Sequence, residues 1–95
     1  MIIDQGPGGQ NDVMVRSLSR AAEKELKQPV VCENKPGGGG VISKNYILKS
    51  KPDGYTIGVQ SISANDSQPH MQKLPYDVLA DQVDIAAYLR YAQCI

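Results

Sequence analysis

Residues 30–43 read VVCENKPGGGGVIS: a short apolar run, a polar turn, four glycines and the start of a second apolar-patterned segment. A short apolar run that is rich in β-branched residues and bounded by turn residues is typical of a strand, so we predict one over Val30–Glu33. Asn34–Gly40 is then a loop, because proline and glycine interrupt regular structure. Apolar residues return within Val41–Leu48, which predicts that this loop leads directly into a helix.

The same order of elements precedes this region. We predict a short strand over Met1–Gln5, which ends where Gly6–Gln10 interrupts regular structure. Apolar residues then recur at helical spacing over residues 12–27, and we predict a helix there. Asn11 or Asp12 is expected to cap it, since a short side-chain oxygen accepts from the unpaired N–H groups of the first turn. A proline two residues beyond the helix ends it.

Downstream, the elements become shorter and less regular. Lys51–Gly54 is a turn in which proline fixes one backbone angle and glycine tolerates a positive one. Tyr55–Val59 predicts a third strand, and Ser61–Gln68 a polar loop. Three further elements are expected on weaker patterns: a helical turn at Pro69–Met71, a short helix at Val78–Val83 and a last strand at Asp84–Tyr91.

Alternation of strands and helices with short connections predicts an α/β fold: a short parallel sheet with flanking helices and right-handed crossovers. The 95 residues suffice for one small domain, spanning residues 1–95. A domain of this size buries only about two-thirds of the surface of its unfolded chain, so we expect its stability to be modest.

Composition excludes several classes of partner. Net charge is zero, and the chain has no Trp, no Phe and only scattered Tyr, so we expect no nucleic acid and no anionic membrane as a partner. No apolar run is long enough to span a bilayer, and no export signal precedes Ile2. Cys32 and Cys94 lie in different segments, and we expect both to be free thiols.

Three predicted loops meet where ligands bind in open α/β sheets, beyond the carboxyl ends of the strands. They are Gly6–Asn11, Asn34–Gly40 and Gln60–Asn65. Glycine lets the backbone approach a ligand closely, and a helix start presents unpaired N–H groups with a partial positive charge. This combination predicts a site for a small anion such as a carboxylate. The alternative is that these glycines only make tight turns.

Other kinds of site have weaker support. A dinucleotide-binding Gly-x-Gly-x-x-Gly pattern is not met, because Asn11 stands where the third glycine belongs. The four glycines are followed by Val41–Lys44 and not by the Lys-Ser/Thr of a phosphate-binding loop. His70 is the only histidine and has no metal-ligand partner nearby in sequence, so we expect it on the surface and predict neither a metal nor a cofactor.

The remaining polar candidates allow two readings each. Ser61 and Ser63 lack the elbow sequence of a nucleophile, and they are equally plausible as ligand donors and as ordinary loop residues. Asp12 is expected to be a helix cap more than a catalytic acid or base. Six lysines are expected to be solvated: Lys24, Lys27, Lys35, Lys44, Lys49 and Lys51.

Five short patterns in register connect the chain to a known family. They are Pro7-Gly8-Gly9 with Asp12 and Arg16, Gln28–Val31 with Glu33–Gly37 and Gly39-Gly40, Pro52–Thr56, Pro69-His70, and Lys73–Asp77. Their order and spacing match nearly the whole chain, from about residue 2 to 86. In these residues the chain resembles the extracytoplasmic solute-binding receptors of tripartite tricarboxylate transporters.

The resemblance implies a partial periplasmic-binding-protein-like (type II) lobe, equivalent to the first part of domain 1 of a two-lobed receptor that closes on a small organic carboxylate. It implies a periplasmic transport protein that works with membrane components and is not an enzyme. The loop residues that match the family's ligand-binding positions are Gly8, Gly9, Gly39, Gly40, Ser61 and Ser63, with Asp12 as a helix cap nearby.

Departures from the family pattern leave other functions open. Val41 stands where the family commonly has Asn, Gln5 where an aromatic is common, and Asn65–Ser67 where apolar residues are usual. The second lobe and the export signal are not in this chain, so we expect a truncated receptor. The alternatives are a remnant that binds nothing, and an enzyme or nucleotide-binding α/β domain.

Overall fold

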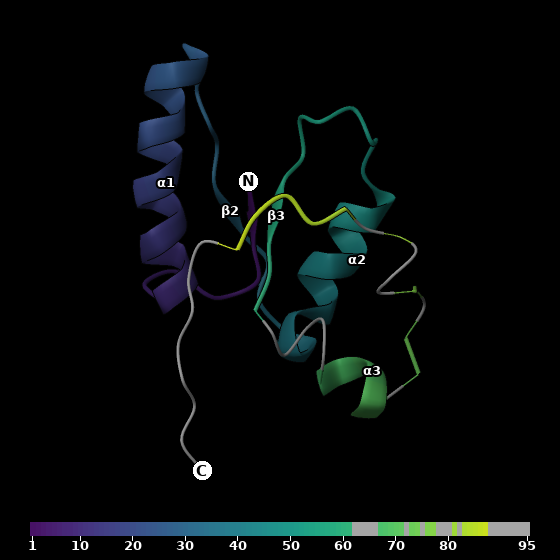
Figure 1. Ribbon diagram of the computed structural model, residues 1–95. Coiled ribbons are helices and arrows are strands. Elements are labelled where there is room, and N and C mark those ends of the chain that lie inside the picture. Colours follow the sequence, from purple (N-terminus) through teal and green to yellow (C-terminus); the bar gives the residue numbers. More distant parts are fainter. Residues whose placement is uncertain (62–66, 72, 75, 78–80, 82, 88–95) are drawn as a thin grey trace.

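The computed structural model describes residues 1–61, 67–71, 73–74, 76–77, 81 and 83–87 (Figure 1). Its strands are β1 (Ile2–Ile3), β2 (Glu33–Asn34) and β3 (Gly58–Val59). Its helices are α1 (Gln10–Leu26), α2 (Val41–Lys49) and α3 (Gln68–Met71), with a 3-10 turn η1 (Gly38–Gly40) directly before α2. Among the described residues, no helix has both the length and the hydropathy needed to cross a bilayer.

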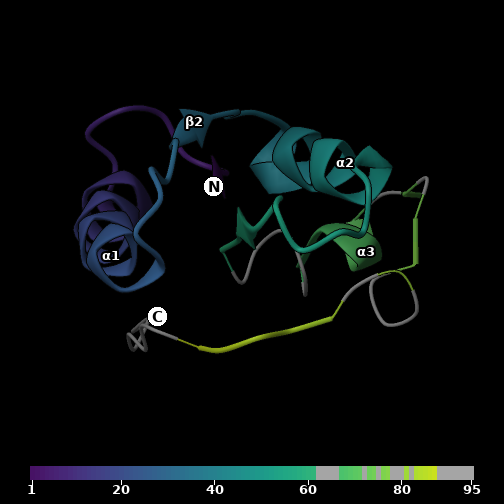
Figure 2. The same ribbon diagram turned by 90° about the horizontal axis from the view of Figure 1, so that it is seen from above.

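The three strands form one parallel sheet in the order β2-β1-β3. Helix α1 joins β1 to β2, and α2 carries the chain from β2 past β1 to β3 on the other side. Seen along the strands, α1 and α2 lie on opposite faces of the sheet (Figure 2). The predicted α/β fold, a short parallel sheet with flanking helices, is confirmed and agrees with a partial lobe of a periplasmic-binding-protein-like domain.

The strands are shorter than predicted, and β2 lies later in the chain than predicted. The register places Ile2 opposite Glu33 and Ile3 opposite Asn34, so the apolar run at residues 30–32 precedes the paired positions. Flanking hydrogen bonds extend the ladder, since the Glu33 N–H donates to the Met1 carbonyl at 2.9 Å. The third strand is likewise confined to Gly58–Val59, and the side chain of Tyr55 stands in solvent.

Helix α1 begins two residues earlier than predicted. Gly9 holds the N-cap position in an extended conformation without a side-chain cap, so the expectation that Asn11 or Asp12 is the cap is wrong. Asp12 lies in the first turn instead, and its carboxylate reaches back to accept from the Gly8 N–H. This backward bond supplies a partner just ahead of the helix, which allows helical structure to start at Gln10.

The later elements are partly as expected. The predicted helical turn at Pro69–Met71 is confirmed as α3, and α2 extends one residue beyond its predicted end. Residues 84–87 form no strand, so that part of the predicted last strand is wrong. Its remainder and most of the predicted Val78–Val83 helix lie outside the described residues.

The buried core is small. Ile3, Val15 and Val59 form it, with Met1 and Cys32 packed against its edge. Each fully buried side chain of this size contributes roughly 1.5–3 kcal/mol, so the apolar contribution is limited. Cys32 is a free thiol, as predicted, with Sγ 3.3 Å from Ser19 Oγ; Cys94 lies outside the described residues.

Removing one methylene group from this core should destabilise the chain measurably. Ile3 is fully buried, so Ile3→Val should lower the free energy of unfolding by about 0.5–1.5 kcal/mol. Ile42 on α2 is 54% exposed, and Ile42→Val serves as the matched control with a much smaller effect. Urea unfolding followed by circular dichroism measures both, and equal losses would contradict this assignment of the core.

Candidate functional site

The carboxyl ends of the three strands lie along one edge of the sheet, at the lower side of Figure 1. The strand order β2-β1-β3 puts a topological switch point between β1 and β3, because the chain leaves β1 toward one side and returns on the other. Open α/β sheets bind ligands in the crevice at such a point. The residues that follow β1 and β3 are therefore the first candidates for a site.

A buried carboxylate occupies this switch point. Asp4 follows β1 directly and is only 5% exposed. Its Oδ2 accepts from the Ser61 N–H at 2.6 Å, and its Oδ1 accepts from Asn11 Nδ2 at 2.8 Å. Asp4 thus ties the loop after β3 to the first turn of α1.

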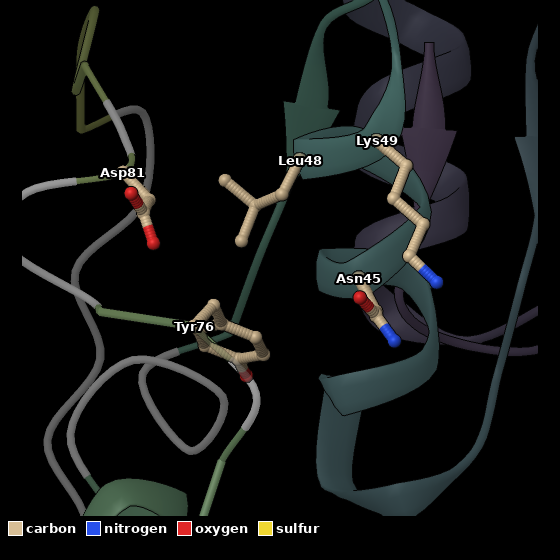
Figure 3. Close-up of a pocket in the computed structure, with 5 residues that line it drawn as sticks. All are labelled: Asn45, Leu48, Lys49, Tyr76 and Asp81. Carbon is tan, nitrogen blue, oxygen red and sulfur yellow. The ribbon is translucent and has the colours of Figure 1, made fainter.

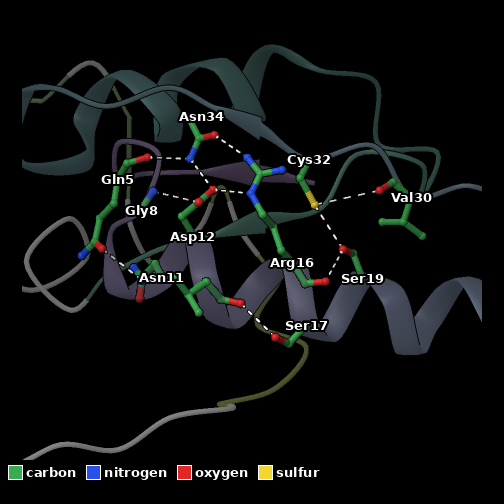
Figure 4. A network of polar contacts seen from close by, with 11 residues as sticks. Gln5, Gly8, Asn11, Asp12, Arg16, Ser17, Ser19, Val30, Cys32 and Asn34 are labelled. Atoms are coloured by element: carbon green, nitrogen blue, oxygen red, sulfur yellow. Dashed lines mark hydrogen bonds and ion pairs between the residues drawn. The ribbon is translucent and has the colours of Figure 1, made fainter.

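A second buried carboxylate lies between the loop after β1 and the end of β2 (Figure 4). Asp12 is 4% exposed, and its Oδ2 accepts from the Gly8 N–H at 2.9 Å. Its Oδ1 accepts from Arg16 Nε at 2.9 Å and from Asn34 Nδ2 at 2.8 Å. These hydrogen bonds, that from Arg16 first and then those from Gly8 and Asn34, lower the pKa of Asp12 from 3.8 to about 2.

Asn34 completes this network. Its Nδ2 also donates to the Gln5 carbonyl at 2.9 Å, and its Oδ1 accepts from Arg16 Nη2 at 3.0 Å. Gln5 in turn accepts from the Asn11 N–H through Oε1 at 3.0 Å. The network therefore fixes the glycine turn after β1 relative to the end of β2.

All four glycines of the second loop have positive φ. Gly37 to Gly40 have φ values of 125°, 57°, 62° and 95°, which residues other than glycine rarely adopt. The Gly40 N–H donates to the Gly37 carbonyl at 3.0 Å, and Ser43 Oγ donates to the Gly40 carbonyl at 2.8 Å. A Cβ on Gly39 would lie 2.2 Å from Gln68 Nε2, so this glycine allows α3 to pack against the loop.

The structure places the predicted glycines and Ser61 in loops at one edge, while Ser63 lies outside the described residues. The expectation that the N–H groups of the glycine corners are unpaired is wrong for Gly8, Gly9 and Gly40, because the chain itself supplies their acceptors. The pairs are Gly8 with Asp12, Gly9 with the Gly6 carbonyl, and Gly40 with the Gly37 carbonyl. A ligand-binding role for these residues stays a prediction.

Sequence reasoning missed both Asp4 and Asn34. Each stands at or directly after the carboxyl end of a strand, which is the position that ligand and loop contacts share in this fold class. Asp4 fell inside the strand predicted over Met1–Gln5, and Asn34 began the predicted second loop but was not singled out there. For Asp4 the available signal was a polar residue immediately after an apolar pair.

Lys44 was expected to be solvated, and the structure corrects this. Its side chain is only 2% exposed, because α2 turns this position inward toward the segment that contains Tyr76. Burial lowers the pKa of Lys44, and Asp84 opposes this change. Its Nζ lies 5.8 Å from the centre of the Tyr76 ring. His70 lies in α3 and is exposed, as expected.

A shallow hollow of about 310 Å³ lies beside α2 (Figure 3). It is lined by Asn45, Leu48, Lys49, Tyr76 and Asp81. None of the predicted site residues contributes to it. Within the described ranges, no three His, Cys, Asp or Glu side chains are grouped so that they could hold a metal ion.

Comparison with known proteins decides the family. Residues 14–95 match the profile described as "Tripartite tricarboxylate transporter family receptor". The chain belongs to this family. The resemblance read from the sequence patterns is therefore confirmed, and the sheet edge described above belongs to a tripartite tricarboxylate transporter receptor.

Several curated proteins are similar to this chain. Protein BugT of Bordetella pertussis is 43% identical over 88 residues, which is 90% of this chain and 27% of the relative. A UPF0065 protein of the same organism is 37% identical over 79 residues, covering 82% of this chain and 24% of the relative. A UPF0065 protein of Cupriavidus necator is 34% identical over 91 residues, which is 93% of this chain and 28% of the relative. The chain thus spans about a quarter of these relatives, and no solved structure matches it significantly.

Acid should unfold this receptor chain partly through Asp12. The pKa of Asp12 is about 2 in the folded chain against 3.8 ordinarily, so its contribution to stability is full above about pH 4 and is lost as the pH falls toward 2. Asp12→Asn should therefore flatten the decline in the free energy of unfolding across this window. Chemical unfolding at a series of pH values measures it.

Asp53→Asn provides the control, because Asp53 lies in an exposed turn and bonds only locally to the Tyr55 N–H. This variant should keep the acid sensitivity of the wild type. An unchanged pH profile in Asp12→Asn would show that the network around Asp12 does not stabilise the fold.

Proposed function

We propose that this chain is the first-lobe portion of a solute-binding receptor that holds a small organic carboxylate at the carboxyl edge of its sheet. The observation that carries the proposal is the open surface at Gly8. This glycine is exposed and has a φ of +80°, and a Cβ added to it would have no atom within 4 Å. Its backbone therefore stands clear of the chain, where a ligand can approach closely.

Local electrostatics favour an anion at this corner. Gly8 and Gly9 precede a helix of 17 residues, whose N-terminus carries a partial positive charge. Arg16 lies one turn after Asp12 on α1. Its side chain remains 45% exposed, while Asp12 and Asn34 hold its guanidinium group in place. Because the Gly8 N–H already bonds Asp12, ligand contacts here would use the other loop groups directly or through ordered water.

The remaining predicted site residues extend this proposal along the sheet edge. Gly39 and Gly40 belong to the second loop, and Ser61 and Ser63 belong to the third, where hydroxyl groups can form hydrogen bonds with the ligand. The ligand would be closed in by a second lobe and delivered to membrane components of the transporter, in the periplasm. The proposal assigns no catalytic residue, cofactor or metal.

A second candidate is a family member that binds no ligand. The observation that favours it is the internal pairing of the expected donors, since Asp12 and Asp4 already accept from the N–H groups of Gly8 and Ser61. In this reading the network at the sheet edge only holds the fold together.

Isothermal titration calorimetry with a panel of mono-, di- and tricarboxylates tests the proposal. Wild-type chain should bind at least one of them, and Gly8→Val should weaken that binding about tenfold or more by filling the open corner. Gly54→Val is the matched control, because Gly54 has φ +83° and equally open surroundings but lies in the turn between α2 and β3. Both variants carry the same backbone strain, so only Gly8→Val should lose affinity.

Two results would contradict the proposal. Absence of heat with every carboxylate at millimolar concentration would favour the non-binding candidate. Equal loss of affinity in the Gly8 and Gly54 variants would show that the effect arises from strain and that the site is misplaced.

A further inference from the structure

We propose that Asp4 is a specificity-determining residue: its buried carboxylate excludes a second anionic group from the β1/β3 switch point. The ligand would then carry one carboxylate, at the glycine corner, and an uncharged or donor group such as an amide or hydroxyl facing Asp4. This inference rests on the proposed function, and it narrows the substrate class to monocarboxylates despite the family's description as tricarboxylate receptors.

The first step is the position of Asp4. It follows β1 directly, so it lies at the switch point between β1 and β3, where an α/β sheet receives its ligand. Its hydrogen bonds to Asn11 and Ser61 place it between the first and third loops that line the proposed site. A ligand that bridges these two loops must pass close to this carboxylate.

The second step concerns the hydrogen-bond donor that Asp4 already binds, the Ser61 N–H. Ser61 follows the end of β3, and its N–H is the group that an incoming carboxylate would need there. Asp4 Oδ2 holds this N–H at 2.6 Å, a short distance typical of a strong hydrogen bond to a charged acceptor. The chain's own carboxylate therefore stands in the place of a ligand carboxylate.

The third step is the charge. The two hydrogen-bond donors given above for Asp4 are both uncharged, an amide and a backbone N–H. Asp12 differs, because Arg16 pairs with it at 2.9 Å. Among the described residues no cation is bonded to Asp4, so its negative charge has no directly paired opposite charge, and a second carboxylate placed beside this buried group would be repelled.

The neighbouring residue adds a second acceptor. Gln60 Nε2 donates to Ser43 Oγ at 3.0 Å, while its Oε1 is buried and has no hydrogen-bond partner among the residues that the structure describes. Buried acceptors without partners are costly, and a donor group on a ligand or an ordered water would relieve that cost. The acceptors after β1 and β3, Asp4 and Gln60 Oε1, therefore favour a ligand that presents a hydrogen-bond donor here over one that presents an anionic group.

Calorimetry with matched ligand pairs tests the inference: succinate against succinamate, and glutarate against glutaramate. Each pair has nearly the same shape and differs by one negative charge. Wild-type chain should bind the monoamides at least about tenfold more tightly than the dicarboxylates. Asp4→Asn, which removes the charge with little change in volume, should tighten dicarboxylate binding and bring the two affinities close to equal.

Asp53→Asn is the control, because it removes the same charge from an exposed turn far along the chain and should leave the preference unchanged. Wild-type binding of a dicarboxylate as tight as that of its monoamide overturns the inference, whether or not Asp4→Asn folds. An unchanged preference in folded Asp4→Asn overturns it too. If no carboxylate or monoamide binds the wild type, the proposed function itself fails, and the inference with it.

Discussion

The carboxylate of Asp12 receives hydrogen bonds from three different parts of the chain: the Gly8 N–H of the turn after β1, Arg16 of α1 and Asn34 at the end of β2. This convergence fixes where α1 starts and how the first glycine turn sits against the neighbouring strand. A carboxylate with several donors is held strongly in its charged form, so its partners are held in turn. The remaining loops at the sheet edge are placed relative to this junction.

Such a junction matters more here because the apolar core is so small. Ile2, Ile3, Val15 and Val59 are the buried hydrophobic residues in the described part of the chain, whereas several large apolar side chains, among them Leu18 and Leu26 of α1, are exposed. The buried polar set is larger than the apolar one and includes Asp4, Asn11, Asp12, Ser19, Ser43 and Lys44. Hydrogen-bonded polar groups therefore provide much of the specificity of this fold, with packing in a supporting role.

The two buried aspartates at the sheet edge have different surroundings, and this difference bears on function. Asp12 is balanced by Arg16 and serves the architecture, while the bonds to Asp4 come from neutral donors at the switch point. Membership of the receptor family gives the class of protein, whereas the surroundings of Asp4 come from the structure. Ligand preference among relatives that share a fold is set by such single groups next to the site.

The sequence by itself determined the alternation of strand and helix, the glycine corners and the family. These depend on local chemistry: apolar periodicity, proline and glycine conformations, and short patterns such as Pro7-Gly8-Gly9 with Asp12. The tertiary structure alone decided that the ladder pairs Ile2 with Glu33, that Asp12 reaches back to Gly8, and that Lys44 is buried. Each of these depends on which distant groups meet in space, and the period of a sequence pattern carries no record of register or of side-chain partners. Asp4 illustrates both kinds of information. Its position after an apolar pair can be read from the local sequence, whereas its hydrogen bond to Ser61, 57 residues away, is known only from the tertiary structure.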